Sequence, residues 1–265
     1  MQSISKMEEE DYKEYLATDW AASRPRLLLF ADIMGFKAMV KSNTHSQLVG
    51  RFRSFINELT KLVEPLETGR HLRLTMFSDS IIMGTDSCTI KNFNIITKAA
   101  ALLLSLCHSY GLPINGCIAC GSLTFDEQIQ TPEMEEEIKG KRKVKPYMPL
   151  FVGDSVVSAH LLNEELFCYG IVLHPSAEKL LQKSNSHKDD KFHHPFIYIP
   201  VPLKSGGYAH LYYLSWTSVP TPKNKDISKD NVKTWLEEIE TSLPTRPRTY
   251  VYNTLEIINR LPSDD

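Results

Sequence analysis

The stretch Leu27–Phe36 reads LLLFADIMGF, in which a run of apolar residues leads into Asp32 and then into Gly35. The apolar run is typical of a buried β-strand, and the glycine allows the chain to turn tightly just after it. Burying a carboxylate at the end of such a strand is costly unless a partner compensates its charge. The stretch therefore predicts a strand whose acidic end faces a cation, a metal ion or water.

The composition is that of an ordinary globular chain. The 265 residues carry a formal net charge of −2 and are 42% hydrophobic, which suits one large domain or two small ones. This charge argues against a dedicated nucleic-acid-binding protein, which normally has a basic excess. The longest apolar run, Ala99–Leu104, is too short to cross a bilayer, and the acidic N-terminus does not resemble a signal peptide. We therefore expect a cytoplasmic protein with no nucleic-acid partner and no membrane partner.

The five cysteines do not predict a disulfide framework, because their number is odd and the chain is expected in the cytoplasm. Cys117 and Cys120 form a CxxC, which would suit half a zinc site or a redox pair. The surrounding sequence is strand-like, so the two side chains point to opposite faces, and no second CxxC or CxxH follows. We therefore expect this CxxC to serve packing alone.

Hydrophobic spacing predicts the secondary structure of most of the chain. Strands are expected at Leu27–Ile33, in a hairpin over Leu72–Met83 with Asp79 near its tip, and at Ile114–Gly121, Gly170–Leu173, Ile197–Val201 and Tyr208–Trp216. Helices are expected at Leu48–Val63, Phe93–His108, Asp154–Asn163, Val232–Leu243 and Tyr250–Leu261. This order favours an α+β fold, with a mostly antiparallel sheet and helices packed on one of its faces.

Composition also suggests how the chain is divided. We expect an N-terminal arm over residues 1–24 and a main domain over 25–220. A charged insertion lies near 127–149, where acidic residues are followed by a basic run. Such a run is usually a solvated loop, and an active-site lid is the alternative. Residues 221–265 are expected to form a helical extension of the same domain.

Two acidic residues, Asp32 and Asp79, each follow an apolar, strand-like segment. If these segments are neighbours in the sheet, the carboxylates meet at one end, where they repel unless one is protonated or a cation lies between them. Hard divalent cations bind such carboxylates together with substrate phosphates. Spacing alone also allows two acids that simply end their strands in water. Gly35 and Lys37 favour the metal site, since helix-start amides and a nearby cation suit a polyphosphate.

Four segments resemble, in order, the motifs of class III nucleotidyl cyclases. They are FADIMGF (Phe30–Phe36), FSDSIIMG (Phe77–Gly84), INGCIACGSL (Ile114–Leu123) and FVGDSVVSAHLLNE (Phe151–Glu164). The resemblance covers about half of the chain and implies the ferredoxin-like fold of a cyclase domain. It also implies that the ribose 3′-hydroxyl attacks the α-phosphorus, that pyrophosphate leaves, and that a homodimer forms with active sites at its interface.

The resemblance assigns roles to individual residues. Asp32 and Asp79 would hold two divalent metal ions, Mn²⁺ or Mg²⁺, with the Ile33 carbonyl as a further ligand. The backbone amides of Ile33, Met34, Gly35 and Phe36 would bind the β- and γ-phosphates, with Lys37 beside them. Phe30 would either line the nucleotide site or belong to the core, as would Phe77, and burial in the core is the expectation for both.

Other positions depart from the cyclase pattern. Val157 and Leu161 replace an asparagine and an arginine that stabilise the transition state and hold the ribose, and neither can donate a hydrogen bond. The positions that usually select the purine base are Thr75 and Leu150, and the usual arginine of the third motif is Asn115. The metal-binding half of the pattern is therefore intact, while the base-reading half is not that of an adenylyl or guanylyl cyclase.

Two explanations fit these departures: a domain that binds nucleotide without turnover, or a cyclase for a different base. The second resembles the pyrimidine cyclases of bacterial antiphage defence, the Pycsar type, because a smaller base would let Thr75 contact its edge directly. We favour a uridylate cyclase that converts UTP to 3′,5′-cyclic UMP and pyrophosphate as an antiviral second messenger. A cytidylate cyclase using CTP and an inactive nucleotide-binding regulator are the alternatives. Candidate replacements for the missing transition-state cation are Arg51, Arg53, Arg70, Arg73 and Lys37.

Overall fold

The computed structural model describes residues 20, 22–66, 71–126, 150–186, 195–215, 228–242 and 245–261. Most of the predicted N-terminal arm and the whole charged insertion near 127–149 lie outside these described residues.

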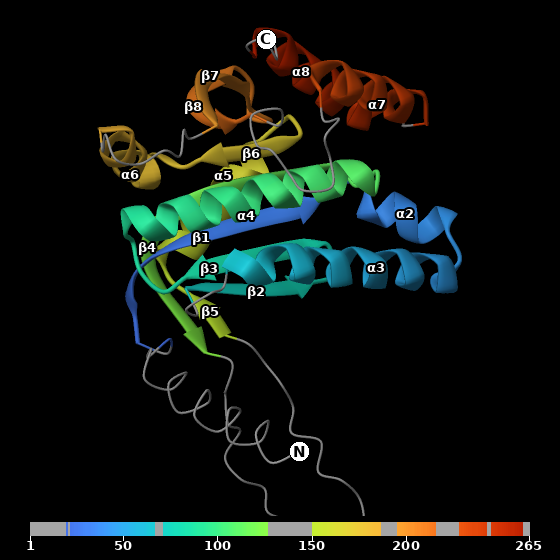
Figure 1. Cartoon of the computed structure of the whole chain (residues 1–265). Coiled ribbons are helices and arrows are strands. Elements are labelled where there is room, and N and C mark those ends of the chain that lie inside the picture. The colour runs from blue at the N-terminus through green and yellow to red at the C-terminus, as the bar shows by residue number, and fades with distance from the viewer. Residues whose placement is uncertain are drawn as a thin grey trace, which may run out of the picture.

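One sheet organises the molecule (Figure 1). Its strands are β1 (Arg24–Ile33), β2 (Leu72–Phe77), β3 (Ser80–Thr85), β4 (Ile114–Asp126), β5 (Leu150–Val152), β6 (Gly170–Leu173), β7 (Phe196–Pro202) and β8 (Tyr208–Leu214). The strands follow the order β2-β3-β1-β4-β6-β8-β7, with β5 paired to β4. Only β4 and β6 run parallel among these pairs, so the predicted mostly antiparallel sheet is confirmed. Sequence patterns did not predict β5, because three residues are too few to show a period of two.

Seven helices within the described residues surround the sheet. They are α2 (Phe36–Ser42), α3 (His45–Val63), α4 (Ile90–Ser109), α5 (Asp154–Glu165), α6 (Pro175–Ser186), α7 (Lys229–Ser242) and α8 (Thr245–Arg260). A capping box of Thr44 and Gln47 starts α3, which buries a stripe of apolar residues with helical spacing. Hydrophobic spacing did not predict α2 and α6. The proline at the first position of α6 is nevertheless a helix-start signal.

Helices cover both faces of the sheet, so the prediction that they pack on one face is wrong. Side chains alternate along a strand, and in β1 the odd-numbered Leu27, Leu29 and Ala31 are fully buried. The even-numbered Phe30 and Asp32 contact side chains of α5. Both α4 and α5 lie against β1. Burial of both sets of residues therefore requires cover on both sides, with α5 on the face that carries Asp32.

Helix α4 is long and apolar enough to cross a membrane by length and composition alone. In the fold, 67% of its most apolar window is buried, and the helix contacts β1, β2 and β3 (Figure 1). This burial is typical of the core helix of a globular domain. No other helix in the described part of the chain passes the same test.

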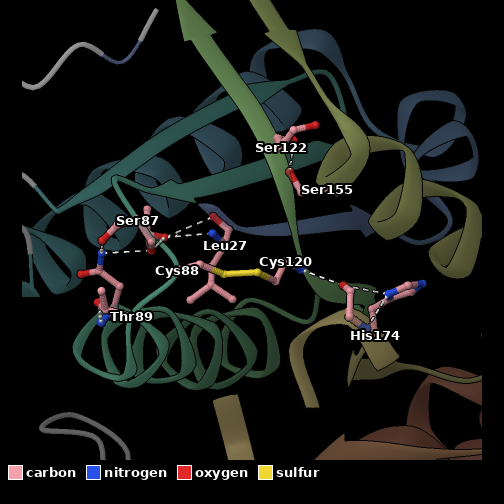
Figure 2. The surroundings of a disulfide bond; sticks show 11 residues. Leu27, Ser87, Cys88, Thr89, Cys120, Ser122, Ser155 and His174 are labelled. Atoms are coloured by element: carbon pink, nitrogen blue, oxygen red, sulfur yellow. Dashed lines mark hydrogen bonds between the residues drawn. A yellow bond between two sulfur atoms is a disulfide. The ribbon is translucent and has the colours of Figure 1, made fainter. Parts of the chain in front are cut away.

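A disulfide joins Cys88, in the loop between β3 and α4, to Cys120 on β4 (Figure 2). Their Cα atoms are 6.7 Å apart, within the usual range for a disulfide. The expectation that the cysteines form no disulfide is therefore wrong, and the CxxC serves packing only through Cys117, which is buried in the core. Sequence spacing could not show the contact, because 32 residues separate the two partners.

Candidate active site

The two predicted metal-binding acids lie at the same end of the sheet. Asp32 is the penultimate residue of β1 and pairs in register with Ser80, the first residue of β3. Asp79 lies in the turn between β2 and β3, and its backbone carbonyl accepts a hydrogen bond of 2.9 Å from the amide of Ile33. The predicted neighbourhood of the first strand and the hairpin is therefore confirmed, and the Asp79 charge is close enough to raise the pKa of Asp32.

Each carboxylate oxygen of Asp32 accepts one hydrogen bond. The Ser80 hydroxyl donates to Oδ1 at 2.6 Å, and the Asn163 side-chain amide donates to Oδ2 at 2.9 Å. Burial raises the pKa of the Asp32 carboxyl above its usual value, the Ser80 hydrogen bond opposes that rise, and the Asp79 charge adds to it. The group thus lies where a negative charge is unfavourable until a cation arrives.

Helix α5 adds three polar residues to this end of the sheet. His160, Asn163 and Glu164 share a helix face, since residues three and four apart are neighbours. The His160 ring packs edge-on against Phe30 with their centroids 5.1 Å apart. His160 lowers the pKa of Asp32 and Glu164 raises it. Sequence patterns did not assign these three residues to the site, although all of them lie within the fourth cyclase-like segment, Phe151–Glu164.

The tip of the hairpin between β2 and β3 is strained at Ser78, which has φ 58. Serine is disfavoured in this left-handed region, and glycine adopts it without a Cβ clash. We expect Ser78→Gly to stabilise the protein by about 1 kcal/mol, because strain of this kind costs roughly that amount or more.

The change should appear as a higher urea midpoint with an unchanged slope. Gly35 has φ 75, so the matched Gly35→Ser variant should move the urea midpoint in the opposite direction. A Ser78→Gly midpoint at or below that of the unmodified chain would contradict the assignment of strain to Ser78.

The turn after β1 offers fewer free amides than the resemblance implies. The amides of Ile33 and Met34 already donate to the backbone carbonyls of Asp79 and Pro113. Gly35 is the N-terminal cap residue of α2, and no side chain caps that end. Of the four backbone amides that the resemblance assigns to phosphate binding, those of Gly35 and Phe36 remain, and the exposed Lys37 follows them.

The residues that differ from the cyclase pattern lie in different parts of the structure. Thr75 lies half-buried on β2, and Leu150 lies on β5, a strand that does not pair with β2. Val157 and Leu161 on α5 expose 56% and 57% of their surface. Phe77 is 81% exposed, so its expected burial in the core is wrong, whereas Phe30 is buried as expected.

Two of the candidate transition-state cations are engaged in structural contacts. Arg51 donates to backbone carbonyls just beyond the end of α4, and the Arg73 guanidinium lies over the Trp20 ring, 5.5 Å from its centroid. Of the other candidates, Arg53 and Lys37 are exposed and Arg70 lies outside the described residues. Lys37 is the exposed cation that directly follows the turn after β1.

The donor set fits a metal ion that arrives with a phosphate group. The described residues contain no group of three or more His, Cys, Asp and Glu side chains that could hold a metal by themselves. An ionised carboxylate has about four acceptor positions, so Asp32 keeps lone pairs beyond the two hydrogen bonds that it accepts. Mg²⁺ typically uses one or two carboxylates and completes its coordination with water and substrate phosphates. Asp32 and Asp79 match that requirement.

Solved structures with the same fold are nucleotide cyclase domains. The guanylate cyclase domain of RhGC from Catenaria anguillulae, in complex with GTP, has a TM-score of 0.50 and 12% identity over 72% of this chain and 96% of that one. The dimeric guanylyl cyclase domain of the RhoGC fusion protein from Blastocladiella emersonii has a TM-score of 0.51, also with 12% identity over 72% and 96%. No family model and no curated protein matches the sequence. The chain therefore has the α+β fold of nucleotide cyclase domains.

Proposed function

We propose that this chain is a metal-dependent nucleotide cyclase. The observation that carries the proposal is the meeting of Asp32 and Asp79 at one end of a sheet with the nucleotide cyclase fold. A buried carboxylate beside a second acid is costly to keep charged, and a divalent cation between the two removes that cost. An acid pair that only ended two strands in water would not need the hydrogen bonds that orient Asp32.

The residues at this end of the sheet would divide the work as follows. Bound metal ions would lower the pKa of the ribose hydroxyl and neutralise the triphosphate. Asp32 and Asp79 would hold these ions, and the amides of Gly35 and Phe36 would bind the terminal phosphates beside Lys37. The ribose 3′-hydroxyl would pass its proton to solvent, and its oxygen would form a bond to the α-phosphorus as the bond from that phosphorus to the pyrophosphate oxygen breaks.

We further propose UTP as the substrate, with CTP as the alternative, and cyclic UMP as a messenger in antiviral defence. Thr75 supports a pyrimidine base, because a smaller base needs no long lysine or glutamate side chain and would let the Thr75 hydroxyl contact its edge directly. The cyclase domain would comprise residues 25–220, with 1–24 as its arm and 221–265 as its extension. A cytoplasmic location belongs to the same proposal, although the Cys88–Cys120 disulfide is unusual there.

The active form is proposed to be a homodimer with its active sites at the interface. Three large apolar residues near the acid pair are exposed. Phe77 ends β2, directly before the turn that holds Asp79, and Val157 and Leu161 lie on α5, the helix that carries Asn163. Exposed apolar surface next to a site commonly marks a contact with another chain. A second copy would cover these residues and close the site against water.

A nucleotide-binding regulator without turnover is the second candidate. It is favoured by Val157 and Leu161, whose side chains cannot donate to a transition state. Losing one such donor typically costs about 10²–10³ in rate. This candidate keeps nucleotide and metal binding and lacks the chemical step.

One experiment separates the candidates. The purified chain is incubated with ATP, GTP, CTP or UTP and Mn²⁺, and products are identified by mass. Cyclic UMP plus pyrophosphate is the expected result. The rate per protein molecule should rise with protein concentration as dimers form. A purine product would contradict the base assignment. Nucleotide binding without any cyclic product would replace the enzyme by the regulator, and no binding at all would refute both.

A further inference from the structure

Asn163 contacts Asp32 from a fully buried position. Its residue is 1% exposed, and its side-chain nitrogen donates to Asp32 Oδ2 at 2.9 Å, across 131 residues of sequence. The other Asp32 oxygen accepts from Ser80, on a different element. One donor from β3 and one from α5 therefore restrict both the position of the carboxylate and the rotation of its plane.

The orientation of the Asn163 amide follows from its neighbour. An ionised carboxylate only accepts hydrogen bonds, so the amide must turn its nitrogen toward Asp32. Its oxygen, Asn163 Oδ1, is buried and accepts no hydrogen bond in the described part of the chain. An unpartnered buried acceptor costs about 1–3 kcal/mol. The fold therefore keeps a buried oxygen without a hydrogen-bond partner at this position while the amide nitrogen binds Asp32. An apolar side chain here would avoid the cost of that oxygen.

We propose that Asn163 is a positioning residue for the divalent metal site, and this inference rests on the proposed function. It holds Asp32 through a neutral donor, which orients the carboxylate without cancelling its charge. A lysine or arginine in its place would compete with the metal for that charge. Groups that hydrogen-bond a metal ligand in this way typically change metal affinity or activity by about 10–100-fold when removed.

Asn115 provides a matched control on β4. It is as well buried as Asn163, at 2% exposure, and it too has a side-chain oxygen with no hydrogen-bond partner among the described residues. Asn115 pairs in register with Asp32 through the backbones of β4 and β1, a pairing that alanine keeps. Its side-chain nitrogen donates to the backbone carbonyl of Asn163 at 3.3 Å, and no side-chain hydrogen bond joins Asn115 to the Asp32 carboxylate among the described residues. Removing either amide deletes a similar buried group. Only removal of the Asn163 amide deletes a hydrogen bond to the Asp32 carboxylate.

The test measures metal binding directly. Mn²⁺ is titrated into the full chain, alone and with UTP, and free Mn²⁺ is followed by electron paramagnetic resonance. We expect Asn163→Ala to raise the apparent Kd for Mn²⁺ by about 10–100-fold, and Asn115→Ala to leave it unchanged. In cyclase assays the half-saturating Mn²⁺ concentration should rise for Asn163→Ala, while the KM for UTP at saturating Mn²⁺ stays the same.

Each outcome has a distinct meaning. Equal losses of Mn²⁺ affinity in the two variants would overturn the inference, because general packing would then explain both. Unchanged affinity in Asn163→Ala would overturn it while leaving the proposed function intact. An unmodified chain that binds no Mn²⁺ with any of the four nucleoside triphosphates would overturn the proposed function and this inference together. If the alanine variants do not fold, Asn163→Leu and Asn115→Leu repeat the comparison at nearly constant volume.

Discussion

Replacing Asp32 with asparagine is expected to reduce cyclase activity on the order of 10³-fold or more, because the variant loses the carboxylate that is proposed to hold the metal. The same variant should be more stable than the unmodified chain. Burial raises the pKa of Asp32, so the folded state holds its proton more tightly than the unfolded state, and the ionised group destabilises the fold at neutral pH. In Asp32→Asn that cost is absent, and the Asn163 amide can turn its unpartnered oxygen toward the new donor.

The sign of this effect can be checked by pH. An acid whose pKa is raised in the folded state destabilises the fold fully above that pKa, and this cost disappears as pH falls through it to the lower pKa of the unfolded state. Acidification should therefore stabilise the unmodified chain relative to Asp32→Asn. The measurement is the melting temperature of both proteins at neutral and mildly acidic pH. A gap that widened on acidification would contradict the argument.

Asp86 is the matched control for the Asp32 substitution. It lies at the other end of β3, where it forms a 2.6 Å contact with His71 and also accepts from the Asn92 amide. Asp86→Asn should therefore lower the melting temperature and leave cyclase activity per folded molecule unchanged. Opposite effects of the two substitutions would separate an acid kept for chemistry from one kept for structure.

Replacing Gly153 with alanine is expected to destabilise the protein by at least about 3 kcal/mol, since both strain and a backbone clash result. Gly153 has φ 152 and lies just before α5, and a Cβ there would come within 2.0 Å of the Ser122 carbonyl oxygen. Because the clash is with backbone, the start of α5 must move away from β4. That shift would also displace the helix face that carries Asn163.

The stability loss can be measured by urea unfolding, with Gly50→Ala as the control. Gly50 lies exposed within α3, and a Cβ there meets nothing within 4 Å. Alanine should therefore stabilise this helix by about 0.5–1 kcal/mol. A Gly153→Ala protein as stable as the unmodified chain would show that the junction between β5 and α5 can relax, contrary to the close approach of its backbone.

Local patterns in the sequence predicted the elements that carry the candidate site. The alternation and apolar runs around Asp32 and in the hairpin over Leu72–Met83 predicted β1, β2 and β3, and the structure pairs β1 with β3. These patterns are readable because a strand or helix imposes its period on consecutive residues. The resemblance then placed Asp32 and Asp79 in one site before any contact was known.

Contacts between distant residues needed the tertiary structure. Asn163 contacts Asp32 because α5 packs on the face of β1 that carries Phe30 and Asp32. The sequence had predicted helices on one face of the sheet alone. The Cys88–Cys120 disulfide likewise depends on how a loop meets β4. No periodicity in the sequence predicts either contact, since each depends on how separate elements pack together.

The sequence by itself therefore determined which residues carry the acid, glycine and apolar spacing of the proposed metal and triphosphate site, because these are local properties. The tertiary structure decided which groups orient those residues. It showed that the amides of Ile33 and Met34 are already bonded, that Arg51 and Arg73 serve structural contacts, and that Asn163 holds Asp32. The physical reason is that a hydrogen bond is limited to about 3 Å in space and has no limit along the chain.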